Sequence, residues 1–176
     1  MKKITLTVLA LSMSFSLLSC GYTTRSALPG KFRMVHVLDF ANKIDFTDES
    51  RKTSYFPLLE VNIRDAIVDR FLFDGNLRIS DMDRADLILE GELINYERVA
   101  LRYTDDDEVQ EYRLQIIVNI KMIDAETDEP IWTENGFAGE ATYFIEGPLV
   151  TTEQSAVQEA TLDLARRVIE RTVEDW

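Results

Sequence analysis

The chain has 176 residues, of which 32 are Asp or Glu and 19 are Lys or Arg, so its formal net charge is −13. This excess of acid argues against nucleic-acid binding, because nucleic-acid affinity comes from counterions released when Lys and Arg neutralise phosphates. It argues equally against a polybasic attachment to an anionic lipid surface. Any partner must therefore be recognised by shape or by local basic patches.

The N-terminus has the pattern of an export signal. Lys2 and Lys3 precede an apolar stretch over Ile4–Leu18, which is too short to span a bilayer core of about 30 Å as a stable anchor. The stretch ends in Leu17-Leu18-Ser19-Cys20, which resembles the bacterial lipobox. An ordinary cleaved signal followed by an incidental cysteine is the alternative.

Cys20 is the only cysteine, so it has no disulfide partner within the chain. Lipidation would use the thiol: the sulfur takes a diacylglycerol, cleavage makes Cys20 the new N-terminus, and its amine takes an N-acyl chain. Each buried methylene contributes about 0.8 kcal/mol, so two or more chains hold a protein on a membrane for a long time. We expect a signal peptide at 1–19, the lipidated cysteine and tether at 20–31, and a single domain at 32–176.

Loss of residues 1–19 removes two lysines and no acidic residue, so the mature chain would have 157 residues and a net charge of −15. Its first predicted element is a strand over residues 32–40, in which Met34 and His36 alternate with Val35 and Val37. The polar residues 41–54 predict a loop.

A helix is predicted over residues 55–73, because apolar side chains recur at three- and four-residue spacing. Its buried stripe comprises Leu59, Ile63, Ala66, Ile67 and Phe71. Gly75 follows, where a helix end favours left-handed backbone.

Strands then follow in a meander. After a short strand at 77–79 and a charged turn at 81–84, residues 87–103 show period two. That period assigns one face to Leu87, Leu89, Gly91, Leu93, Val99, Leu101 and Tyr103. Residues 112–123 alternate in the same way, and 131–144 form the next strand, where Gly136 and Gly139 indicate a bulge or a close backbone approach.

The last predicted element is a helix that opens with a capping box from Thr151 to Gln154. Its buried stripe comprises Val157, Ala160, Leu164 and Val168. The element order predicts an α+β fold, a two-layer sandwich with two amphipathic helices packed on one face of a small, mostly antiparallel, four-to-five-stranded sheet.

The hairpin is longer than the helices that would cover it. Residues 87–103 would extend about 56 Å as a strand, whereas residues 55–73 cover about 29 Å as a helix. The hairpin should therefore project beyond its own helices. Cover from a partner protein is the interpretation we favour for the patch of Val99, Leu101, Tyr103 and Tyr112. The alternative is a strand that breaks near Asn95 and folds back.

A symmetric hairpin would place Tyr103 opposite Tyr112 and Arg102 opposite Arg113, with Arg98 on the same face as the two arginines. Facing arginines repel each other unless an anion joins them, and a phosphate would suit them. A candidate contact for an anion such as lipid A phosphate therefore comprises Arg98, Arg102, Arg113 and Lys121. Local neutralisation by Asp105–Glu108 and Glu111 is the alternative.

Catalysis is not expected, since no nucleophile elbow, phosphate-binding glycine loop or His/Cys metal spacing is present. His36 is the single histidine and fits a packed or edge position in a strand. The acidic run Asp105–Glu108 lacks the glycine and terminal glutamate of a calcium-binding EF-hand loop. A solvated hairpin tip is the simpler interpretation, and the sequence does not decide whether the tip binds a divalent cation.

The chain resembles the LptE family of lipopolysaccharide-assembly lipoproteins in the order and spacing of short pieces. They are Cys20-Gly21-Tyr22, Leu28-Pro29 before residues 35–42, Phe71–Gly75, Ala85–Gly91, Glu111–Leu114 and Pro130-Ile131-Trp132. The resemblance implies two helices on a small sheet and a lipid anchor in the outer membrane on the periplasmic side. It also implies a 1:1 heterodimer in which the lipoprotein plugs the LptD barrel, helps it fold and assists lipopolysaccharide insertion into the outer leaflet.

Gly21 fits outer-membrane sorting, since an aspartate there would suggest inner-membrane retention. Members of the family have a basic hairpin-tip position implicated in lipopolysaccharide contact, whereas the tip is acidic here, so direct lipopolysaccharide binding stays open. The alternative function is an outer-membrane lipoprotein that binds and regulates a cell-wall synthase. A tether of about ten residues argues against it, because a flexible chain of that length reaches only a short way.

Overall fold

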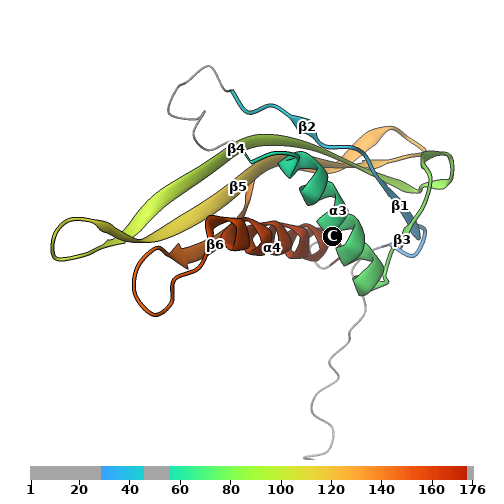
Figure 1. The fold of residues 1–176 in the computed structure, drawn as a ribbon. Coiled ribbons are helices and arrows are strands. Elements are labelled where there is room, and N and C mark those ends of the chain that lie inside the picture. The colour runs from blue at the N-terminus through green and yellow to red at the C-terminus, as the bar shows by residue number, and fades with distance from the viewer. Residues whose placement is uncertain (1–28, 46–55, 174–176) are drawn as a thin grey trace, which may run out of the picture.

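The computed structural model describes residues 29–45 and 56–173; the predicted signal peptide, Cys20 and most of the tether lie outside the described residues (Figure 1). The elements in chain order are β1 (Met34–Val37), β2 (Ala41–Asn42), α3 (Leu59–Asp74), β3 (Arg78–Ile79), a 3-10 turn (Met82–Arg84), β4 (Leu87–Tyr103), β5 (Val109–Asp124), β6 (Glu129–Phe144) and α4 (Glu153–Val173). Among the described helices, none has the length and apolar character needed to cross a membrane.

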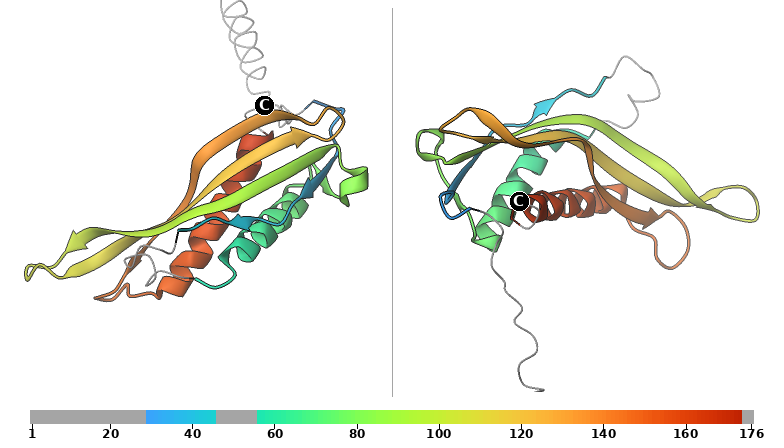
Figure 2. Two further views of the ribbon diagram at one scale, coloured as in Figure 1. Left: turned by 90° about the horizontal axis from the view of Figure 1, so that it is seen from above. Right: turned by 180° about the vertical axis from the view of Figure 1, so that it is seen from behind.

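The strands form one six-stranded sheet in the order β3-β1-β4-β5-β6, and β2 pairs with β4 next to β1. The β4–β5 and β5–β6 pairs are antiparallel, whereas β1 and β2 run parallel to β4 and β3 runs parallel to β1. Both helices cover the same face of the sheet (Figures 1 and 2). The predicted two-layer α+β sandwich is confirmed, with β2 as an extra strand inside the predicted loop.

The core lies between the sheet and the helices. On β5, the buried residues follow period two as predicted: Leu114, Ile116, Val118, Ile120 and Met122. The predicted stripe of α4, Val157, Ala160, Leu164 and Val168, is buried against them. A fully buried Leu, Val, Ile or Met side chain contributes about 1.5–3 kcal/mol, so this layer holds the two long elements together.

The helix α3 begins at Leu59 and not at residue 55, because Leu58 adopts the left-handed conformation with φ 58°. Four of its predicted stripe residues are buried, and Ala66 is half-buried beside the core. Gly75 ends the helix with φ 78°, and its N–H donates to the carbonyl of Phe71. A left-handed residue of this kind is the usual helix terminator.

The two glycines of β6 have the roles predicted for them. Gly136, at φ 69°, lies where the pairing with β5 shifts between Val118 and Ile120. Gly139 is buried beneath α4, and a Cβ there would overlap the carbonyl of Ala160 and the side chain of Leu164. The absence of a side chain at 139 therefore sets how closely α4 packs on the sheet.

The cap of α4 differs from the prediction by one residue. The hydroxyl of Thr152 accepts a hydrogen bond from the N–H of Ser155 at 3.1 Å, so Thr152 is the capping residue and the predicted pairing of Thr151 with Gln154 is wrong. The Thr151 N–H instead donates to the carbonyl of Phe144. Adjacent threonines offer the same local pattern, and the path of the loop from β6 selects between them.

The strand β4 spans Leu87–Tyr103 as predicted, but it reverses its faces part of the way along. Leu93 pairs with Val118 and Asn95 pairs with Ile117, so Ile94 is an extra residue in a bulge. A one-residue shift moves every later side chain to the other face of the sheet. Tyr96 is consequently buried, and the single apolar face predicted to continue from Leu93 to Tyr103 is wrong.

The hairpin of β4 and β5 projects past the start of α4, well beyond the cover of either helix (Figures 1 and 2). The predicted overhang is confirmed, and the alternative of a strand that breaks near Asn95 is wrong, because β4 and β5 stay paired as far as Tyr103 and Val109. The described chain begins at the opposite end of the sheet, where the ammonium of Lys31 lies 2.9 Å from the carboxylate of Asp124.

Candidate functional site

The register of the projecting hairpin is not symmetric. Tyr112 lies opposite Ala100, and Arg113 lies opposite Val99. A second shift between Ala100 and Arg102 places Arg102 opposite Glu111. The predicted Tyr103–Tyr112 and Arg102–Arg113 pairs are therefore wrong, because three register shifts along β4 and β5 change both the facing partners and the side of the sheet that each residue occupies.

Arg98 lies on the helix-facing side of the hairpin, opposite the buried Leu114. Its guanidinium donates to Oε2 of Glu153 at 2.8 Å. The same guanidinium lies 5.6 Å from the ring centroid of Tyr112, and Tyr112 stacks on Tyr143 with the centroids 5.7 Å apart. Arg98 thus joins the hairpin to the first turn of α4.

Tyr96 completes this polar cluster, because its hydroxyl donates to Oε1 of Glu153 at 2.5 Å. Burial raises the pKa of Tyr96 above its ordinary value, and the adjacent Glu153 carboxylate raises it further. Burial also raises the pKa of Tyr143, while a hydrogen bond to Tyr143 raises the pKa of Arg98. The phenols stay neutral and Arg98 stays charged, so Glu153 and Arg98 form the ionic pair of the cluster.

Sequence reasoning missed Tyr96, Tyr143 and Glu153, although each carries a signal. The two tyrosines are large aromatic residues in strands, where a buried hydroxyl needs a polar partner. Glu153 is acidic in the first turn of a helix, where a negative charge is favourable. Only the bulge at Ile94 brings Tyr96 to the side on which Glu153 lies.

Arg102 and Arg113 lie on the opposite face of the hairpin and are each next to a carboxylate. The Nε atom of Arg102 is 3.6 Å from Glu111, and its guanidinium lies 5.7 Å from the ring centroid of Phe144. The Nε atom of Arg113 is 3.7 Å from Glu140 of β6. Glu111, one of the residues predicted to neutralise the arginines, lies beside Arg102. None of the other predicted neutralising residues, Asp105–Glu108, forms an ion pair with a described residue.

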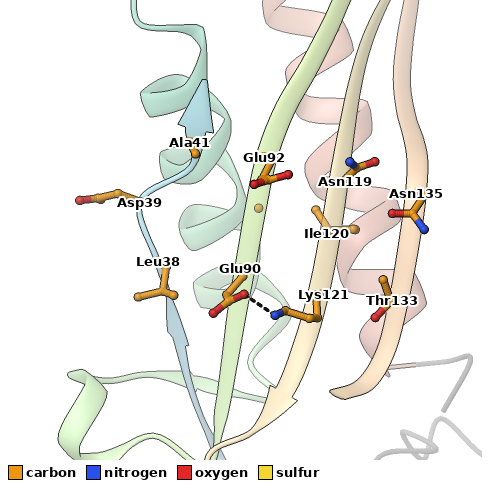
Figure 3. A pocket seen from close by; sticks show the side chains of 11 residues that line it. Leu38, Asp39, Ala41, Glu90, Glu92, Asn119, Ile120, Lys121, Thr133 and Asn135 are labelled. Atoms are coloured by element: carbon orange, nitrogen blue, oxygen red, sulfur yellow. Dashed lines mark ion pairs between the residues drawn. The ribbon is translucent and has the colours of Figure 1, made fainter. Parts of the chain in front are cut away.

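Lys121 lines a hollow of about 420 Å³ on the helix-free face of the sheet (Figure 3). Its ammonium lies 2.6 Å from Oε2 of Glu90. Glu92 and Asp39 also line the hollow, as do the amides of Asn119 and Asn135. Three carboxylates and one cation disfavour an anionic ligand there.

The structure does not bring the four predicted anion contacts together. Arg98 faces the helices, while Arg102, Arg113 and Lys121 lie on the other face. Lys121 is also about 26 Å from Arg113 along β5, at about 3.3 Å per residue. Each of the four cations is within 4 Å of a carboxylate. Their role toward an anion stays a prediction.

Apolar side chains are exposed at the hairpin end of the sheet. Val99, Leu101 and Tyr103 are 45%, 40% and 56% exposed, whereas Tyr112 is half-buried in the tyrosine stack. The loop from β6 to α4 adds Ile145, Leu149 and Val150 at 44%, 65% and 53% exposed, which sequence reasoning missed. We call Val99, Leu101, Tyr103, Ile145, Leu149 and Val150 the hairpin-end surface.

The loop of the hairpin-end surface is fixed to the strands. The N–H of Ile145 donates to the carbonyl of Gln110 at 3.0 Å, and Val150 forms a bridge with Phe144. The hairpin and this loop therefore lie at the same end of the molecule (Figure 1). Their exposed apolar groups therefore share one end of the molecule (Figure 1), with Val99 on the face of the hairpin that Arg113 occupies.

The hairpin turn itself is closed by Thr104, whose N–H donates to the carbonyl of Glu108 at 2.7 Å. Asp107 takes the left-handed conformation with φ 61°. Across residues 29–45 and 56–173, no group of three or more His, Cys, Asp or Glu side chains is placed to hold a metal ion. His36 lies on β1, inside the sheet, and its Nδ1 is 2.8 Å from the carbonyl of Ser80.

Comparison with known proteins gives a family and a fold. A family model described as LptE, lipopolysaccharide-assembly, matches residues 35–172. The search of curated proteins returned no match. Three solved structures have a TM-score of 0.50 and 11% sequence identity to this chain: an uncharacterized lipoprotein B from Nitrosomonas europaea, a hypothetical protein from Chlamydia trachomatis and a protein from Xanthomonas campestris.

The Nitrosomonas lipoprotein aligns over 89% of this chain and 91% of its own. The Chlamydia protein aligns over 80% of this chain and 95% of its own, and the Xanthomonas protein over 80% and 83%. At this identity the likeness shows a shared fold alone.

Proposed function

The chain belongs to the lipopolysaccharide-assembly family LptE, and on that premise we propose that it is an outer-membrane lipoprotein that plugs the LptD barrel, helps it fold and supports lipopolysaccharide insertion into the outer leaflet. The role is structural and requires no catalysis. The complex is a 1:1 heterodimer, and Cys20 carries the lipid that holds the domain on the periplasmic side.

The observation that carries this proposal is the uncovered hairpin end. Val99, Leu101 and Tyr103 belong to the last part of β4, in the projecting hairpin, and they are exposed among the residues that the structure describes. Exposed apolar groups gathered in one region mark sites of interaction with other proteins. A barrel that surrounds the domain would bury them.

The size and polarity of the sheet suit the inside of a barrel. The 16 residues of β5 extend about 50 Å, a little more than the 40–45 Å thickness of a membrane with its headgroups. The helix-free face carries Glu90, Glu92, Asn119 and Lys121, and the lumen of a large barrel is likewise polar. The domain can therefore fill the lumen without any lipid-facing surface.

Direct lipopolysaccharide binding by Arg98, Arg102, Arg113 and Lys121 is not included in the proposal, because each is already next to a carboxylate. Support for lipopolysaccharide insertion would then come through the barrel.

Co-purification tests the proposal. The tagged, lipidated protein is extracted from outer membranes in mild detergent, and a large barrel is expected at one-to-one stoichiometry. Depletion of the protein should lower both the amount of folded barrel and the lipopolysaccharide at the cell surface. Recovery of a cell-wall synthase in place of a barrel would support the alternative function, and recovery of no integral membrane protein would contradict the proposal.

A matched test addresses the anchor. Cys20→Ala should move the protein from the membrane pellet to the soluble periplasmic fraction, because the acyl chains are lost. Ser19→Ala keeps the thiol and serves as the control. Membrane association that survives in Cys20→Ala would show that another segment holds the protein.

A further inference from the structure

We propose that the hairpin-end surface and the acidic hairpin tip together dock into an apolar socket with a basic rim on the barrel. This inference rests on the proposed function and adds the chemistry of the contact. It assigns the acidic tip to protein recognition and adds the β6–α4 loop as a second contact segment.

Carboxylates without an ionic partner among the described residues lie in both segments of this surface, whereas the nearby cations Arg102 and Arg113 are each within 4 Å of a carboxylate. Asp105, Asp106, Asp107 and Glu108 form the hairpin tip, and Glu146 follows Ile145 in the β6–α4 loop. None of these five forms an ion pair with any described residue. Along the same hairpin, by contrast, Glu90 and Glu111 each lie beside a cation.

The unpaired charges select the kind of partner. An apolar patch bordered by one sign of charge is complementary to a pocket bordered by the other sign. An anionic lipid surface would be repelled by the carboxylates at the tip. A second copy of the same end would bring like charges together, which costs free energy. A protein pocket with Lys or Arg at its rim fits both the apolar and the charged groups.

The cluster of Tyr96, Arg98 and Glu153 fixes the position of the hairpin before a partner binds. Glu153 accepts hydrogen bonds from both Tyr96 and Arg98 of β4, so the start of α4 is tied to the hairpin. The β6–α4 loop lies between β6 and this anchored turn, and Thr151 and Ile145 bind it to the neighbouring strands. The two apolar segments therefore keep a fixed relative position, which lowers the entropic cost of binding.

The test measures binding of the full-length, lipidated protein to the detergent-solubilised LptD barrel over a range of salt concentrations. Asp105→Asn/Asp106→Asn/Glu108→Gln removes three charges from the tip at nearly constant shape. Its control, Glu126→Gln/Asp128→Asn/Glu129→Gln, removes three charges from the β5–β6 turn at the other end of the sheet, where none forms an ion pair with a described residue.

A second pair of variants tests the apolar groups. Leu149→Ser/Val150→Ser changes the loop, and Met82→Ser/Leu162→Ser changes two exposed residues elsewhere, 55% and 63% exposed. The loop variant should bind about tenfold or more weakly at every salt concentration, since buried apolar contacts are insensitive to salt. The tip variant should bind about tenfold more weakly at low salt and lose most of its salt dependence. Both controls should stay within about twofold of wild type.

The outcomes separate this inference from the proposed function. If wild type binds the barrel and the tip and loop variants bind equally well, the inference is overturned while the proposed function stands. If wild type binds no barrel, both fall. The inference is also overturned if the tip charges instead govern binding to phosphatidylglycerol vesicles, or self-association measured by analytical ultracentrifugation. Circular dichroism and thermal melts check that all four variants fold.

Discussion

The hydroxyl of Tyr96 donates a 2.5 Å hydrogen bond to Glu153, a residue 57 positions further along the chain. The bond joins β4, just after its bulge, to the first turn of α4. Arg98 uses the other carboxylate oxygen at 2.8 Å. One carboxylate therefore fixes the projecting hairpin relative to the helix that covers the sheet.

This cluster predicts measurable coupling between Tyr96 and Glu153. Tyr96→Phe should lower the free energy of unfolding by about 1–2 kcal/mol, because a hydrogen bond to a charged acceptor is lost. Glu153→Gln should lower it as well, since Arg98 loses its ionic partner. Urea denaturation of both single variants and the double variant gives the coupling energy, expected near 1 kcal/mol. Tyr103→Phe, at an exposed position, is the control, and strictly additive effects would contradict the prediction.

The same residues predict how stability depends on pH. The pKa values of Tyr96 and Tyr143 are raised above 10.0 in the folded protein, chiefly by burial. The contribution of these two tyrosines to the free energy of unfolding is complete below pH 10. It falls as the pH rises further, because the unfolded chain then releases protons that the folded chain keeps. Urea titrations between about pH 8 and 11 should show this decline, with a smaller slope in Tyr96→Phe. Equal slopes would show that Tyr96 ionises normally.

Gly139 predicts a steric limit beneath α4. Gly139→Ala should lower the free energy of unfolding by about 2 kcal/mol or more, because the added methyl group meets the Ala160 carbonyl and Leu164, which must move. Thermal melts followed by circular dichroism measure the loss. Gly30→Ala, where no heavy atom lies within 4 Å, should change little. A neutral Gly139→Ala would mean that α4 can shift away from the sheet without cost.

The corrected cap of α4 predicts unequal effects of two adjacent threonines. Thr152→Ala removes the acceptor for the Ser155 N–H and should cost about 1 kcal/mol. Thr151 uses only its backbone N–H in the bond to Phe144, so Thr151→Ala should cost much less. Chemical denaturation measures the free energy of unfolding of both variants. A larger loss in Thr151→Ala than in Thr152→Ala would contradict the prediction and support the capping box from Thr151 to Gln154.

The sequence by itself determined the elements and, within regular stretches, the faces that they bury. Period two on β5 and three- to four-residue spacing on α4 identify core residues such as Ile116 and Leu164, because an unbroken strand or helix repeats its orientation at a constant interval. Gly75 indicated a helix end, and Gly136 and Gly139 indicated a bulge or a close backbone approach, because a residue without a side chain permits left-handed backbone and close packing.

Only the tertiary structure decided where Arg98, Val99 and Tyr96 point. The bulge at Ile94 is a property of two paired strands, because it depends on which residue of β5 faces which residue of β4. Asn95 and Glu97 interrupt the apolar period of residues 87–103, but this break does not identify the extra residue. The same holds for β1 and β2, whose parallel pairing with β4 comes from the path of the chain around α3. Local spacing sets orientation inside an element, whereas register between elements is set by contacts far apart in the sequence.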